Sequence, residues 1–99
     1  MTIKVKRTAY QPGVMIQHAG YSRFTDPRTG ELSYVRRLGT NFYPRWHVYL
    51  DEDQDLVKIN LHLDQKQPSY QGSRKHSGEY SGPAVEAEAD RIYQVFTAN

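Results

Sequence analysis

The residues of this chain whose types and spacing could support chemistry are two histidines and an aspartate: His62, Asp64 and His76. Side chains at i and i+2 on one strand face stand about 6 to 7 Å apart, so His62 and Asp64 can reach one ligand. If the chain after Asp64 folds back, His76 joins them, and His47 lies on the neighbouring predicted strand. Two histidines with one carboxylate could hold zinc or iron, or act as a general acid–base pair on a phosphodiester.

These residues also have a plainer interpretation. His-x-Asp is a frequent coincidence, and a surface histidine beside a solvated aspartate needs no cofactor. The sequence favours this alternative, with neither a metal nor catalysis. Arg74 and Lys75 lie in a glycine-containing stretch before a predicted helix, which makes them candidate anion ligands. A connection that only supplies turns and a helix cap explains the same stretch, and is preferred.

The candidate residues depend on a predicted hairpin whose arms, residues 45–50 and 56–64, alternate apolar and polar side chains. Pairing apolar with apolar side chains puts Val48 opposite Val57 or Ile59, because an odd shift would expose the whole apolar set to water. The opposite face of the hairpin then carries a shared polar set: Arg45, His47, Tyr49, Lys58, Asn60 and His62.

The remaining pattern predicts more strands and one helix, which begins at a proline and has apolar residues at helical spacing. In chain order the predicted elements are a basic arm or edge strand over 1–12, a strand with a bulge at Gly20 over 14–24, a hairpin over 21–38, the hairpin over 45–64, a long loop over 65–82 and a helix over about 83–97. We therefore predict an α+β fold, an antiparallel four- to five-stranded meander with one C-terminal helix packed on one face. Residues 13–99 form its single domain.

One helix covers only one face of such a sheet, so the polar face is expected to be open. Four further side chains are less direct additions to it: Tyr21, Arg23, Tyr34 and Arg36. Residues 1–50 hold eight Lys or Arg against two acids, whereas residues 51–99 hold five against nine. Rings interleaved with cations on a sheet suit single-stranded nucleic acid, because bases stack on rings while cations hold phosphates.

The first hypothesis is therefore a small non-enzymatic binding module for nucleic acid or another anionic partner. The second is a small metal-dependent or histidine-based hydrolase centred on His62, Asp64 and His76. The third is a protein-interaction or homodimerisation module that buries the polar face.

The composition bears on the cellular compartment in which the protein is expected. The chain has no cysteine, which excludes disulfides, thiolate metal sites and thiol nucleophiles and favours a reducing compartment. No apolar run approaches the roughly 20 residues of a membrane span, and residues 1–7 lack the apolar stretch of a signal peptide. We therefore expect a cytoplasmic protein with no membrane partner.

Three stretches, YPRWHVYLDE, NLHLDQKQPSY and HSGEYSGPAVEAEADRI, together resemble a small, uncharacterised bacterial protein family. The resemblance covers most of residues 13–96. It implies a bacterial source and a single domain, and it brings no activity, ligand or catalytic residue to this chain.

Overall fold

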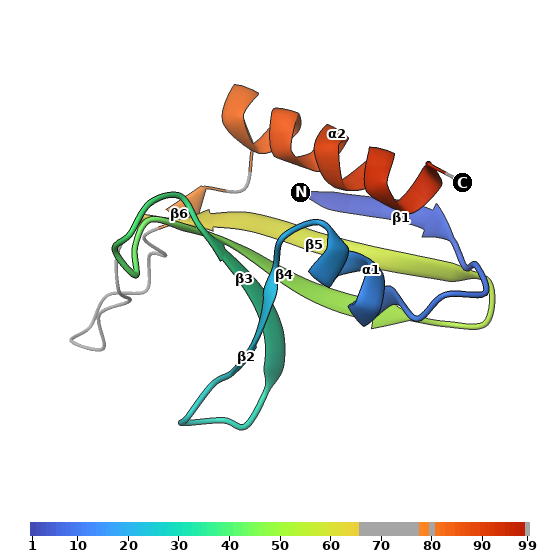
Figure 1. Cartoon of the computed structure of the whole chain (residues 1–99), viewed down its shortest axis with the longest axis horizontal. Coiled ribbons are helices and arrows are strands. Elements are labelled where there is room, and N and C mark those ends of the chain that lie inside the picture. The colour runs from blue at the N-terminus through green and yellow to red at the C-terminus, as the bar shows by residue number, and fades with distance from the viewer. Residues whose placement is uncertain (66–77, 80, 99) are drawn as a thin grey trace.

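The computed structural model describes residues 1–65, 78–79 and 81–98, which form one antiparallel sheet and two helices (Figure 1). The elements are β1 (Thr2–Lys6), α1 (Pro12–His18), β2 (Ser22–Thr25), β3 (Leu32–Arg37), β4 (Arg45–Glu52), β5 (Leu56–Asp64), β6 (Gly78–Glu79) and α2 (Pro83–Thr97). The strand order is β1–β5–β4–β3–β2, and the short β6 pairs with the end of β5. The predicted α+β class, an antiparallel sheet with a C-terminal helix, is confirmed.

The register between β4 and β5 differs from the predicted one. Val48 lies opposite Leu61, not opposite Val57 or Ile59 as the pattern alone suggested. The apolar side chains still face one another, because the shift is by an even number of residues. The turn decides the register: the Asp53 carboxylate accepts hydrogen bonds from the backbone N–H groups of Asp55 and Leu56, at 2.8 and 2.7 Å. This places the tip of the hairpin further along the chain.

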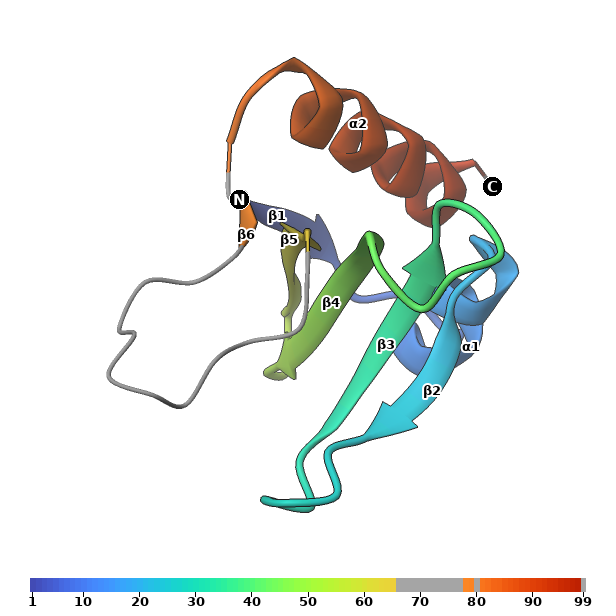
Figure 2. The same cartoon turned by 90° about the vertical axis from the view of Figure 1, so that its left-hand side faces the viewer.

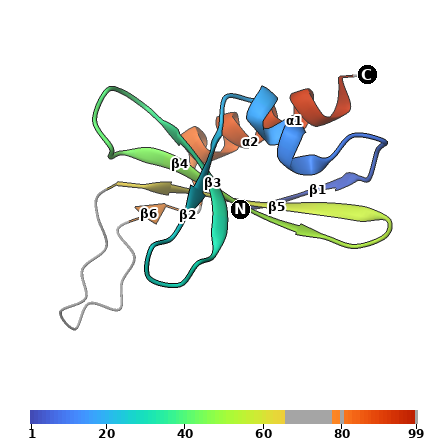
Figure 3. The same ribbon diagram turned by 60° about the horizontal axis from the view of Figure 1, so that its bottom comes forward.

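Both helices lie on the same side of the sheet (Figure 3). Helix α2 packs against β1, β5 and α1, and its buried stripe is Val85, Ala89, Ile92 and Phe96. Fully burying each large apolar side chain stabilises the fold by roughly 1.5 to 3 kcal/mol. None of the described helices is long and apolar enough to span a membrane.

Helix α1 is the main correction to the sequence prediction, which expected a strand over residues 14–24. Pro12 stands at the first helical position, where its missing N–H costs nothing. Met15, Ile16 and Ala19 are buried at helical spacing, whereas Val14 is exposed. The signal in the sequence was therefore present, a proline and a glycine bracketing three apolar residues of period 3 to 4. The strand prediction had interpreted Gly20 as a bulge at which the alternation shifts, whereas it marks the end of a helix.

Gly20 ends α1 and is not a strand bulge. Its φ is +99°, in the left-handed region. The backbone N–H of Gly20 donates to Gln17 O at 2.9 Å, and that of Tyr21 to Ile16 O at 3.2 Å. These two bonds make a Schellman motif, the common way of closing a helix with a glycine. The motif turns the chain sharply from α1 into β2.

Replacing Gly20 with alanine is expected to lower the free energy of unfolding by about 1 to 2 kcal/mol, because a Cβ is strained at positive φ. A Cβ there would also meet Arg36 Nε at 3.3 Å. Gly39→Ala is the matched control, since no described residue lies within 4 Å of its added Cβ and its φ is not positive. Urea unfolding of both variants measures the difference, and equal stabilities would show that Gly20 is not needed for its conformation.

Candidate site on the polar face

The face of the sheet opposite the helices, here called the polar face, carries the side chains that alternate with the apolar core. Its members on β1, β4 and β5 are Thr2, Lys4, Lys6, Arg45, His47, Tyr49, Lys58, Asn60, His62 and Asp64. His47 lies directly opposite His62, and Tyr49 opposite Asn60. The six residues predicted to share one face of the hairpin therefore do share it.

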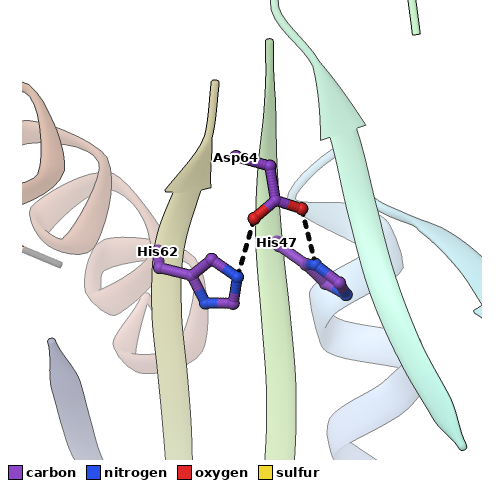
Figure 4. Close-up of side chains that lie close together, drawn as sticks. All are labelled: His47, His62 and Asp64. Atoms are coloured by element: carbon purple, nitrogen blue, oxygen red, sulfur yellow. Dashed lines mark hydrogen bonds and ion pairs between the residues drawn. The ribbon is translucent and has the colours of Figure 1, made fainter. Parts of the chain in front are cut away.

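Asp64 lies between the two histidines at the end of this face (Figure 4). Its Oδ2 is 2.8 Å from His47 Nδ1, and its Oδ1 is 2.8 Å from His62 Nε2. Arg45 Nε also donates to Oδ2, at 3.1 Å. The carboxylate thus has three partners, supplied by β4 and by β5 itself.

The electrostatics of the site centre on Asp64. Burial by itself would raise the pKa of this carboxyl, but hydrogen bonds from His47 and His62, with their charge, hold it well below its usual range. Asp64 is therefore a carboxylate under all ordinary conditions. It is the only acid among the described residues that contacts both histidines.

The second ring nitrogen of His47 points to Ser33 on β3. His47 Nε2 lies 2.8 Å from Ser33 Oγ, which in turn donates to the carbonyl oxygen of Phe24 at 3.4 Å. Ser33, His47 and Asp64 are thus hydrogen-bonded to one another in the same way as the serine, histidine and aspartate of a serine-hydrolase triad. Ser33 is only 2% exposed, however, so its hydroxyl lies beneath the surface where a substrate cannot reach it. The arrangement positions His47 and does not present a nucleophile.

Arg45 is held by aromatic rings as well as by Asp64. Its guanidinium carbon lies 4.9 Å from the ring centre of Phe24 and 4.6 Å from those of Phe42 and Tyr43. Its Nη1 is buried with no hydrogen-bond partner among the described residues. Cation–π contacts of this kind explain how the guanidinium is accommodated in the interior. Arg45 is therefore a buried anchor and not a surface cation.

Four predicted additions to the polar face lie elsewhere. Tyr34 and Arg36 are opposite Val48 and Trp46, on the helix-covered face, and Arg23 pairs with Tyr34. The physical reason is α1, which the sequence analysis missed. A Cβ on Gly13 of that helix would lie 2.6 Å from Tyr34 Oη, so this ring is covered by α1.

Tyr21 is likewise buried on the helix side, with its hydroxyl donating to Glu88 Oε2 of α2 at 2.7 Å. Burial and this neighbouring carboxylate raise the pKa of the Tyr21 hydroxyl. Glu88 also receives Arg91 at 2.8 and 2.9 Å and Arg36 at 3.5 Å. This cluster joins the end of α1, β3 and α2 and has no opening to the polar face.

Three predicted site residues, His76, Arg74 and Lys75, lie outside the described residues, so the convergence of His76 with His62 and Asp64 stays a prediction. Instead, His47 completes a group of three. His47, His62 and Asp64 each offer one ligand atom, and these atoms lie within 4.8 Å of one another.

Sequence reasoning also missed Ser33, Thr2, Lys4 and Lys6 as members of this surface. The alternation of Lys4 and Lys6 with Ile3 and Val5 was visible. What the pattern lacked was the neighbour of β1, which the structure identifies as β5, with Lys4 opposite Lys58.

Comparison with known proteins gives no functional assignment: no family model matches the chain, and no curated protein or solved structure matches it significantly. A functional argument therefore has to start from the geometry of the polar face.

Proposed function

We propose that this protein is a small non-enzymatic binding module that holds single-stranded nucleic acid on the polar face. The observation that carries the proposal is a stack of aromatic rings on this face of the sheet. Tyr49 is stacked on His47 with 4.7 Å between ring centres and 27° between planes, and is near-parallel to His62 at 6.0 Å and 23°. A base that stacks on such a ring gains about 1 to 3 kcal/mol without regard to its sequence.

Cations stand beside these rings in positions suited to phosphates. Lys4 and Lys58 are directly opposite each other across β1 and β5, and Lys6 lies one step further along the same face. Asn60, next to Tyr49, has a side-chain amide that could bond a base edge, and Thr2 Oγ1 now donates to its Oδ1 at 2.8 Å. Asp51 lies on the other side of Lys58, so the positive surface is confined to the β1 side.

Binding is favoured over hydrolysis by the state of the polar groups. The hydroxyl of Ser33 is closed off, and His47 is buried between Asp64 and Ser33. The exposed part of the described surface carries mainly rings, amides and ammonium groups, which are the groups that recognise bases and phosphates. A homodimer formed through the same face is the alternative that light scattering on the purified protein would reveal.

The test is a titration of fluorescently labelled single-stranded RNA and DNA, followed by anisotropy in the presence of a chelator. If two or three phosphates are neutralised, raising salt from about 50 to 200 mM lowers the affinity roughly 7- to 20-fold. Lys58→Glu is expected to weaken binding at least about tenfold at the lower salt, because it removes one phosphate contact and adds repulsion.

Arg23→Glu is the matched control. It reverses the same charge at an exposed position, but Arg23 pairs with Tyr34 and so lies on the helix side of the sheet. Its affinity should stay close to that of the unchanged protein. Equal losses in both variants would mean that net charge, not the polar face, attracts the nucleic acid, and binding insensitive to salt would refute the proposal.

A further inference from the structure

We propose that His47, His62 and Asp64 form a binding site for one divalent first-row transition-metal ion of the zinc class, with His47 Nδ1, His62 Nε2 and a carboxylate oxygen as ligands. The inference does not depend on nucleic-acid binding: it shares His47 and His62 with the ring stack, but it rests on their ring nitrogens and on Asp64, not on the faces of the rings. It replaces His76 of the sequence-based hypothesis with His47, which β4 places directly opposite His62.

The spacing of the three ligand atoms fits an ion. Zinc bonds of about 2.0 to 2.2 Å in tetrahedral geometry put ligand atoms roughly 3.3 Å apart. Each histidine nitrogen is now 2.8 Å from an oxygen of Asp64, and the whole set lies within 4.8 Å. To admit an ion, the two histidine nitrogens have to move slightly away from the carboxylate oxygens, which opens both hydrogen bonds. The ion then takes the place of the protons that these bonds share.

The groups behind the ligands are arranged as they are around bound metals. A histidine that ligates through one nitrogen usually donates its other N–H to a fixed acceptor. His47 Nε2 lies 2.8 Å from Ser33 Oγ, and the Ser33 hydroxyl donates a hydrogen bond to the carbonyl oxygen of Phe24 at 3.4 Å. When an ion binds, Nδ1 gives up the proton that it donates to Asp64 in the metal-free site, and the remaining proton of His47 lies on Nε2, facing Ser33.

Asp64 is oriented in the same manner. Arg45 Nε donates to Oδ2 at 3.1 Å, while Oδ1 faces His62. The guanidinium thereby fixes the carboxylate plane and leaves Oδ1 for coordination. The guanidinium is itself held in place by three aromatic rings, whose negative faces attract its charge.

The donor set selects the class of metal. Two imidazoles and one carboxylate suit zinc(II), iron(II) and their first-row neighbours, whereas magnesium and calcium prefer ligand sets made of oxygen. Three protein ligands leave at least one position for water or an outside ligand. The site lies at the edge of the polar face, where His62 and Asp64 are partly exposed.

The experiment is a titration of chelator-stripped protein with cobalt(II), read by visible absorption, followed by zinc(II) in a calorimeter. We expect saturation at one ion per chain, displacement of cobalt by zinc, and no response to magnesium. His62→Gln should weaken binding more than the about 10- to 100-fold that loss of an outer hydrogen-bond partner costs. Ser33→Ala, which keeps all three ligands, should weaken it by roughly tenfold.

His18→Gln is the matched control, because it removes an exposed histidine at the end of α1 and leaves the site intact. Circular dichroism checks that each variant is folded, and if His62→Gln is not, Ser33→Ala carries the comparison. The inference is overturned if no saturable binding occurs, or if the site variants bind as tightly as His18→Gln. Either result leaves the nucleic-acid proposal standing, since its titrations are made with chelator present.

Discussion

Replacing Asp64 with alanine is expected to lower the free energy of unfolding by about 3 to 5 kcal/mol, the largest effect of any single change on the polar face. Asp64 neutralises Arg45, and the side chains of this pair are only 14% and 5% exposed. Without the carboxylate, the buried guanidinium loses the one acid that it pairs with among the described residues, and His47 loses the acceptor of its Nδ1. Urea unfolding followed by circular dichroism measures the loss.

Asp55→Ala provides the comparison, because Asp55 is an exposed aspartate in the turn that begins the same strand. Surface substitutions of this kind usually change stability by about 0.5 kcal/mol or less. If Asp64→Ala were as stable as Asp55→Ala, the contacts of Asp64 with Arg45 and His47 would contribute nothing to folding.

The pH dependence of stability gives an independent check on Asp64. A carboxyl whose pKa is lower in the folded state than in the unfolded chain stabilises the fold above its unfolded pKa, about 3.9. That contribution is lost as the pH falls from there through the lowered folded value. The unchanged protein should therefore lose stability below about pH 4, and Asp64→Asn should lose less over the same interval.

Replacing Glu88 with alanine is expected to cost about 2 kcal/mol, and to lower the melting temperature by roughly 8 to 16 °C. The main cause is Tyr21, whose buried hydroxyl loses its acceptor. Arg36 and Arg91 contribute less, because their side chains are 37% and 39% exposed and water can replace the carboxylate. Differential scanning calorimetry measures the shift.

Glu86→Ala is the matched control on the same helix. Glu86 is exposed in the first turn of α2, where its charge interacts with the helix dipole, worth about 0.3 to 1 kcal/mol. A much larger loss for Glu88 than for Glu86 is the expected result. Similar losses would mean that the cluster around Glu88 adds no stability beyond that of an ordinary helix surface.

How far the sequence could predict the site varied with the range of the interactions involved. The alternation along β4 and β5 correctly placed His47 and His62 on one face, because alternation is a property of the extended backbone itself. The same reasoning failed for Tyr34 and Arg36. Alternation determines which residues of one strand share a face. It does not determine which face of β3 continues the polar face of β4, because that depends on the register between the two strands, and the loop between them does not reveal the register.

Burial of polar residues was also beyond the sequence. Arg45 and His47 have the composition of an open basic surface, yet both are buried. The cause is the approach of Phe24, Phe42 and Tyr43, which come from β2 and from the loop between β3 and β4. The hairpin of β2 and β3 extends away from α2, so its position relative to β4 is set by the twist of the sheet (Figure 2).

By itself, then, the sequence determined the strands β2 to β5, the helix α2 and the α+β class, because each follows from local periodicity and turn chemistry. Only the tertiary structure decided that Tyr34 and Arg36 lie on the helix-covered face, and that Asp64 receives His47 and His62 together. These outcomes depend on pairings between segments distant along the chain. Local pattern carries no information on distances of that kind, so the three side chains proposed to hold a metal came together only in the folded sheet.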